Sequence, residues 1–278
     1  MARRKLRLIH NMARSGSTLI CKCLGCMDGV RLLSELHPLA WRLFNPVEQA
    51  VHWFGLLTQA DIESLQRQGT MGYSAVIELI ERRCSERGEV LVLRDWAHLD
   101  YTGVPFLEKP SFRPLLYDVL AETFDIVRVS TARDPVAQWQ SLTQLSIMKE
   151  PLRSGKLNPE MYLAGYRRYA ELCVETGFVR YEDLLSNPSI AMADLCGRLE
   201  IGFDSGFLTK WHLYKTITGD VNNPRTSDKI AMTPRRPVDA ELAKRFAGNA
   251  DYQRACELLS YDSVVAGAPA DGINLAAS

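Results

Sequence analysis

The chain has 278 residues, 46% of them hydrophobic, and its 33 basic residues balance its 33 acidic ones. A chain of this size buries roughly three quarters of its unfolded surface, so we expect one domain over residues 1–261, followed by a flexible tail of small residues at 262–278. Zero net charge excludes a global attraction to nucleic acid or to an anionic membrane, and no stretch approaches the roughly twenty apolar residues of a membrane span. We therefore expect a cytoplasmic protein that binds neither nucleic acid nor a membrane.

The cysteine content indicates reduced thiols rather than a disulfide framework or a metal site. Seven cysteines in a chain of this length leave at least one unpaired. Cys21, Cys23 and Cys26 point in different directions on a helix, and no further Cys or His completes a familiar ligand spacing. We predict no metal site.

Helical and strand patterns alternate along the chain, which is typical of an α/β fold with a mainly parallel central sheet flanked by helices. In chain order, the patterns predict a strand at 6–9, a helix at 19–27, a turn and strand at 29–33, helices at 46–57, 61–68 and 73–87, a strand at 90–93, a helix at 114–123, a strand at 126–131, helices at 136–148 and 159–176, a strand at 178–181, and helices at 187–199 and 239–259. Ligands of such sheets bind at the carboxyl ends of the strands.

A loop of small residues at 12–17 connects the first strand to the first helix. The loop and the first helical turn read Arg14, Ser15, Gly16, Ser17, Thr18, Leu19. A strand, loop and helix in this order direct backbone N–H groups and the positive end of the helix dipole at one point, which predicts an anion site. The loop is not a Walker A motif, because no lysine follows Gly16.

The order of these residues resembles the 5′-phosphosulfate loop of sulfotransferases that use 3′-phosphoadenosine 5′-phosphosulfate (PAPS), which have a P-loop-like fold. The resemblance implies that Gly16 lets the backbone approach the phosphate and that the hydroxyls donate to its oxygens. It also places Arg14 beside the oxygen that bridges phosphate and sulfate. Arginine stands there in the tyrosylprotein branch and in many carbohydrate and bacterial branches, whereas the cytosolic branch usually has lysine. The alternative is an ordinary loop with a helix cap.

Arg133 directly follows the strand at 126–131, and Ser141 lies on the next helix. An arginine after a strand with a serine eight positions later resembles the family's 3′-phosphate motif. A guanidinium and a hydroxyl together suit one phosphate, since arginine offers paired donors and serine a short rotatable one. The alternative is that Arg133 pairs with Asp134 and Ser141 lies on the helix surface. Two separate phosphate sites imply a nucleotide phosphorylated at both ends.

The stretch VRYEDLLSNP at 179–188 resembles a third family segment, more weakly. The resemblance places Tyr181 near the adenine, while Glu182 and Asp183 are expected to cap and orient the following helix. The basic stretch at 219–236 resembles the nucleotide-closing segment only loosely. The candidates there for the 3′-phosphate or the sulfate are Arg225, Ser227, Lys229, Arg235 and Arg236. The alternative, a solvated loop charge, is favoured for each of them except Arg225.

Sulfuryl transfer needs a general base for the acceptor and a stabilised leaving phosphate. The resemblance assigns the leaving phosphate to Arg14, Ser17 and Thr18. Glu35 has the spacing from the loop cation at which tyrosylprotein sulfotransferases carry their catalytic glutamate, and His98 follows a strand as the cytosolic branch's histidine does. The remaining base candidates are His37 and Asp95. The alternative for Glu35 is a structural role, in which it would pair with a nearby arginine such as Arg31.

We therefore predict a PAPS-dependent sulfotransferase that moves a sulfuryl group to a hydroxyl or amine of a small-molecule acceptor and releases PAP. A homodimer is left open. The alternatives are a P-loop kinase, which should have a Walker lysine, and a non-catalytic nucleotide-binding protein. Aromatic residues that suit an apolar or aromatic alcohol, or else belong to the core, are Trp41, Phe44, Trp53, Phe54, Trp96, Tyr101 and Phe106.

Overall fold

The computed structural model describes residues 3–67, 69, 72–219, 229–232 and 236–263. Within them, five parallel strands form one sheet in the order β2-β3-β1-β4-β5. The strands are β1 (Arg4–Asn11), β2 (Val30–Leu36), β3 (Val90–Asp95), β4 (Phe124–Ala132) and β5 (Phe178–Arg180). The predicted α/β fold with a parallel central sheet is confirmed.

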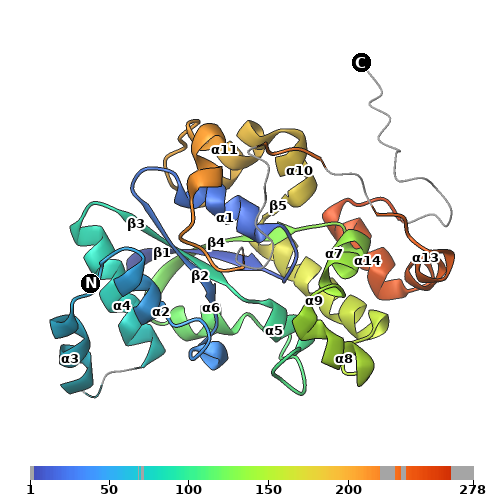
Figure 1. Cartoon of the computed structure of the whole chain (residues 1–278), viewed down its shortest axis with the longest axis horizontal. Coiled ribbons are helices and arrows are strands. Elements are labelled where there is room, and N and C mark those ends of the chain that lie inside the picture. Colours follow the sequence, from blue (N-terminus) through green and yellow to red (C-terminus); the bar gives the residue numbers. More distant parts are fainter. Residues whose placement is uncertain (1–2, 68, 70–71, 220–228, 233–235, 264–278) are drawn as a thin grey trace.

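Alternate side chains of the sheet point to two separate cores, as the pleat of a strand requires. In β1, Leu6 and Leu8 face a core shared with α2 (Pro46–His52), α4 (Tyr73–Glu86) and α6 (Leu115–Leu120). Ile9 faces the opposite core, shared with α1 (Ser17–Gly25), α10 (Tyr181–Ser186) and α11 (Pro188–Arg198). Figure 1 shows the two groups of helices on opposite faces of the sheet.

A third core covers the carboxyl side of the sheet. It joins α5 (His98–Thr102), α7 (Pro135–Leu142), α9 (Pro159–Thr176), α13 (Ala240–Ala247) and α14 (Ala250–Leu259), which Figure 1 shows together on the right. The remaining helical segments are η1 (Pro38–Ala40), α3 (Gln59–Arg67), η2 (Ser146–Met148), α8 (Lys149–Arg153), α12 (Phe207–Lys210) and η3 (Trp211–Leu213).

Several boundaries differ from the predicted ones. The second strand runs on to Leu36, so Glu35 lies within β2 rather than after it. The predicted helix at 136–148 ends at Leu142, and the predicted helix at 239–259 is two helices, the second capped by the Asn249 side chain. Helix α5 and the very short α8 and α12 were not predicted, because four or five residues are too few to display a helical period.

All seven cysteines are free thiols. None of the helices in the described ranges is both long and apolar enough to cross a membrane.

After β1 the chain continues to β2 at one edge of the sheet, and after β4 it continues to β5 at the opposite edge. β1 and β4 are neighbours, with Asn11 opposite Thr131. Their outgoing loops therefore diverge at a topological switch point, where ligands of open α/β sheets bind. The predicted phosphate-binding segments are these two loops.

Candidate active site

The backbone between β1 and α1 turns sharply through two left-handed residues. Arg14 has a φ of 69° and Gly16 a φ of 83°, and the Ser15 N–H donates to the Met12 carbonyl over 3.2 Å. A Cβ atom on Gly16 would stand 2.1 Å from a ring carbon of Tyr181. Only glycine fits there. The turn brings the start of α1, whose first N–H groups lack partners within the helix, to the carboxyl edge of the sheet.

Two of the predicted cofactor-binding side chains are turned into the protein. The Ser15 hydroxyl lies 3.0 Å from Thr131 Oγ1 of β4 and is buried, so it ties the loop to the sheet. Leu19 is buried in the core beneath α1. Any contact of these two residues with a ligand would therefore come from their backbone.

The residues predicted for the two phosphates lie against each other. Arg14 Nε donates to Ser141 Oγ over 2.8 Å, and an Arg133 Nη donates to the Arg14 carbonyl over 3.0 Å. Arg14 is more than 100 positions from the other two residues along the chain, and the loops after β1 and β4 bring them together. The structure thus joins the predicted 5′ and 3′ phosphate residues in one site.

The Arg133 guanidinium has no anionic partner among the described residues. Its carbon lies 4.9 Å from the centre of the Tyr181 ring, and its Nε is buried without a hydrogen-bond partner. The ion pair with Asp134 considered as an alternative does not form; instead, the Asp134 side chain accepts from the Ala137 N–H and caps α7. A partly buried cation whose charge is not matched by a carboxylate favours an anionic ligand.

The predicted roles of Glu182 and Asp183 need correction. Both residues lie in the first turn of α10, and the cap of the next helix, α11, is Asn187. Asp183 pairs with Arg180. Glu182 accepts a hydrogen bond from the backbone N–H of Asp134, so it supports the loop that carries Arg133.

Arg94 of β3 is the site residue that the sequence did not reveal. Its side chain is fully buried, and its Nη atoms donate to Ser17 Oγ (3.5 Å), Thr18 Oγ1 (3.3 Å) and Ser34 Oγ (2.6 Å). It also donates to the hydroxyl (2.9 Å) and the carbonyl (3.3 Å) of Thr218. The available signal was a cation on a strand that is otherwise apolar on this face.

Glu35 is placed beside the loop by an irregularity in β2. The register with β3 shifts between Leu33 and Leu36, and Glu35 adopts a left-handed φ of 57°. Its carboxylate lies 3.4 Å from an Arg94 nitrogen, while 19% of its side chain remains exposed. A Cβ on Gly219 would stand 3.3 Å from Glu35 Oε1 and 3.2 Å from Thr18 Oγ1, so these two groups flank the same backbone segment. The expected structural partner, Arg31, pairs with Glu89 instead.

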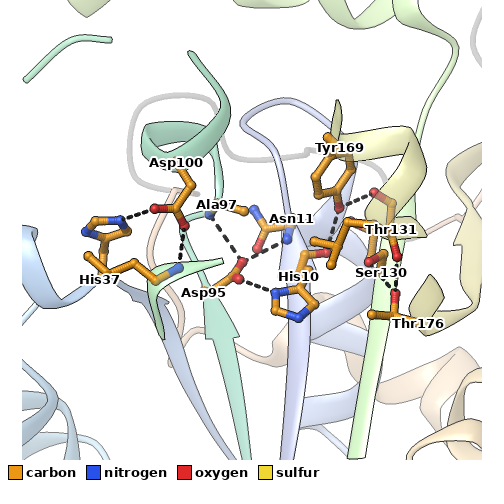
Figure 2. A network of polar contacts seen from close by, with 12 residues as sticks. His10, Asn11, His37, Asp95, Ala97, Asp100, Ser130, Thr131, Tyr169 and Thr176 are labelled. Carbon is orange, nitrogen blue, oxygen red and sulfur yellow. Dashed lines mark hydrogen bonds and ion pairs between the residues drawn. The ribbon is translucent and has the colours of Figure 1, made fainter. Parts of the chain in front are cut away.

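Two of the other base candidates are held in the buried polar network of Figure 2. Asp95 accepts from the backbone N–H of Asn11 (2.9 Å) and from His10 Nδ1 (2.5 Å). The Leu39 N–H donates to His37 Nδ1, so the neutral ring carries its proton on Nε2 and donates it to Asp100 over 3.2 Å. Both side chains therefore have their polar atoms occupied by the fold.

The remaining candidate, His98, is fully buried at the start of α5. Its Nε2 lies 3.2 Å from Thr102 Oγ1, and its Nδ1 has no hydrogen-bond partner among the residues that the structure describes. Burial lowers the pKa of His98 to about 3. The imidazole is therefore neutral at working pH but enclosed.

The basic stretch at 219–236 is described only in part. Arg225, Ser227 and Arg235 lie outside the described residues. Arg236 donates to the Gln140 carbonyl over 3.4 Å, one residue before Ser141, so this end of the stretch lies against α7. No group of three or more His, Cys, Asp or Glu side chains in the described ranges is arranged to hold a metal ion.

No family model and no curated protein match the chain in sequence. Its structure is similar to a sulfotransferase domain from the olefin synthase of Synechococcus, with a TM-score of 0.65, 19% identity, and 94% of this chain and 96% of that chain covered. It is also similar to a sulfotransferase domain from the curacin biosynthetic pathway, with a TM-score of 0.65, 17% identity, and 94% and 99% covered. The chain therefore has the sulfotransferase fold.

Proposed function

We propose that this protein transfers the sulfuryl group of PAPS to the hydroxyl or amine of a small-molecule acceptor. The observation that carries the proposal is the meeting of three residues at the switch point of the sheet, where Arg14 is hydrogen-bonded to both Ser141 and Arg133. Phosphate groups are the anions that arginine side chains bind best, because the planar guanidinium offers paired donors.

PAPS fits this donor set because it carries one phosphate at the 3′ position and one at the 5′ position. Arg133 and Ser141 would hold the 3′-phosphate, and the unpartnered Arg133 Nε supplies a donor for it. The N–H groups at the start of α1, together with Arg14, would hold the 5′ side. The Tyr181 ring, packed against Gly16 and Arg133, offers a flat surface beside both sites for the adenine. PAPS, when bound, supplies the sulfuryl group.

Arg14 and the hydroxyls of Ser17 and Thr18 would stabilise the negative charge that grows on the departing phosphate. Such donors act most strongly when they are fixed in advance. Arg94 contacts both hydroxyls, which holds them in position and adds a positive charge behind them.

Glu35 would act as the general base that accepts the proton of the acceptor hydroxyl. It is the candidate base that is both partly exposed and adjacent to Thr18, across Gly219. Arg94 fixes one carboxylate oxygen of Glu35, and geometry is the first requirement of a proton acceptor. The enclosure of His98 supports Glu35 over His98.

The acceptor would enter between the loops that follow β2 and β3. The backbone N–H of Trp96 donates to the Leu36 carbonyl over 3.0 Å, at the end of the strand that carries Glu35. Its ring packs edge to face with Phe44 (5.1 Å) and Phe106 (5.8 Å), and Phe106 is 50% exposed. An apolar wall at this place suits an alcohol with an apolar or aromatic body.

The kinase alternative has less support. The acid placed to bind Mg²⁺ after a strand would be Asp95, whose carboxylate already accepts from His10 and Asn11. The loop also has no lysine after Gly16. No observation favours a second function over sulfuryl transfer.

The proposal is tested by incubating the full chain with PAPS and a panel of alcohols of increasing apolar size, with PAP release followed by chromatography and sulfate esters by mass spectrometry. We expect PAP release that depends on the acceptor, and a sulfated product. A parallel incubation with ATP and Mg²⁺ tests the kinase. ADP formation there, or PAP binding without acceptor-dependent release across the panel, would contradict the proposal.

A further inference from the structure

The peptide unit between Arg133 and Asp134 is held from both sides. Its carbonyl, that of Arg133, accepts from the Tyr166 hydroxyl over 2.5 Å. Its N–H, that of Asp134, donates to Glu182 Oε1 over 3.0 Å. This peptide leads directly from the predicted 3′-phosphate arginine to α7, the helix that carries Ser141. A shift of the peptide would therefore move both predicted ligands of the 3′-phosphate.

The second oxygen of Glu182 is bound by the end of the described chain. Glu182 Oε2 accepts from the Tyr261 hydroxyl over 2.8 Å. Arg180 fixes the same segment, because it donates to the Ser260 carbonyl over 2.8 Å and its guanidinium carbon lies 5.6 Å from the Tyr261 ring centre. Both carboxylate oxygens of Glu182 thus have a fixed donor, one from the 3′-phosphate loop and one from the residues after α14.

We infer that Glu182 is a positioning residue for the 3′-phosphate site and that Tyr261 holds Glu182 in place for this role. The inference rests on the proposed function, because it assigns the 3′-phosphate to Arg133 and Ser141. Glu182 touches neither of their side chains in any described contact and acts through the Asp134 N–H. The selectivity for a 3′-phosphorylated nucleotide then depends on two successive hydrogen bonds. One joins the loop after β4 to Glu182 of α10, and the other joins Glu182 to Tyr261 after α14.

Selectivity distinguishes positioning from general stability. A variant that only loosens the fold lowers the affinities for PAP and for 5′-AMP alike, whereas a displaced Arg133 loop weakens PAP alone, since only PAP has the 3′-phosphate. The measured quantity is the ratio of the two dissociation constants, determined by calorimetry on the full chain.

Glu182→Ala removes the acceptor of the Asp134 N–H, and we expect the PAP to 5′-AMP selectivity to fall about tenfold, somewhat more than one ordinary hydrogen bond. Tyr261→Phe removes one hydroxyl with little risk to folding and should lower the selectivity about threefold. Glu182→Gln should retain most of it, because the amide oxygen still accepts from Asp134 and the amide nitrogen can donate to Tyr261. Asp194→Ala is the matched control, since Asp194 is an exposed acid paired with Arg198 on α11.

The outcomes separate the inference from the proposed function. A wild-type protein that binds PAP and 5′-AMP equally would overturn the proposed function and this inference with it. A selective wild type whose Glu182→Ala and Tyr261→Phe variants keep the full selectivity would overturn the inference alone. Tighter binding of PAP in both Glu182→Ala and Glu182→Gln would also overturn it, because Glu182 would then act only by repelling the phosphate.

Discussion

The loops after β1 and β4 and the loops after β2 and β3 meet at the same sheet edge but are built differently. On the first side, Arg14 is hydrogen-bonded to both Arg133 and Ser141, and a hydrogen bond between Ser15 and Thr131 ties the loop to the sheet. On the second side, Glu35 near the end of β2 pairs with Arg94 of β3, and the loops that follow these strands form an apolar wall of Phe44, Trp96 and the exposed Phe106. Phosphate recognition needs particular donors at particular backbone positions. An apolar acceptor needs only shape and size, so many sequences can satisfy it.

The largest effect, on turnover, is expected from Glu35, the proposed general base on the acceptor side. Glu35→Gln keeps the shape of the side chain but removes its ability to take a proton, so turnover should fall roughly a hundredfold or more while PAP affinity stays within a few-fold. Steady-state kinetics and calorimetry measure the two quantities. His98→Asn is the control; an almost fully active Glu35→Gln beside an inactive His98→Asn would reassign the base to the histidine.

On the nucleotide side, Arg133→Ala should remove most of the preference for PAP over 5′-AMP. The lost charged hydrogen-bond partner corresponds to about 2 kcal/mol of binding free energy or more. Calorimetric titration of the variant with both nucleotides checks this. A variant that keeps the wild-type preference would show that the 3′-phosphate, if bound, is bound elsewhere.

A smaller, acceptor-dependent effect tests the apolar wall. Phe106→Ser removes an exposed ring that packs on Trp96, and the KM of the most apolar acceptor that is turned over should rise about fivefold to tenfold, with PAP affinity unchanged. Phe203→Ser is the matched control, because Phe203 is similarly exposed (41% against 50%) and packs beside Phe207 instead. Equal KM changes in the two variants would show that the apolar wall does not contact the acceptor.

The smallest effect concerns the enclosed His98. Its folded-state pKa is lowered to about 3 by burial, so the unfolded chain binds a proton near pH 6.5 that the folded protein rejects. The stability associated with a neutral His98 is thus present above pH 6.5 and is lost as the pH falls. Between pH 7 and pH 5.5 we expect a loss of about 1 kcal/mol from this group.

Denaturant unfolding of the wild type and of His98→Asn at the two pH values isolates this contribution. The wild type should lose about 1 kcal/mol more than the variant over that interval. The same loss in both proteins would indicate that burial does not lower the pKa of His98 in the folded protein, and His98 would again be a candidate general base.

The two regions also differ in how far the sequence predicted them. The strands and long helices followed from periodic apolar residues. The residues proposed to bind phosphate followed from a motif, because phosphate chemistry restricts which residue types can stand there. Glu35 was named as a base candidate from its spacing to the loop, but its position within an irregular β2 and its ion pair with Arg94 were not. Both depend on the pairing of β2 with β3 and of β3 with β1, which is a long-range property. Glu182 was misassigned for the same reason, since its partners lie 48 and 79 residues away.

We propose above that the protein binds a nucleotide phosphorylated at both its 3′ and 5′ positions. Calorimetric titration of the intact chain with PAP, 5′-AMP and ATP, each with and without Mg²⁺, tests this binding. We expect PAP to bind at least tenfold more tightly than 5′-AMP, as one charged hydrogen-bonded phosphate should allow, and Mg²⁺ not to change this ratio. Equal affinity for PAP and 5′-AMP, or preferential binding of ATP with Mg²⁺, would contradict the proposal.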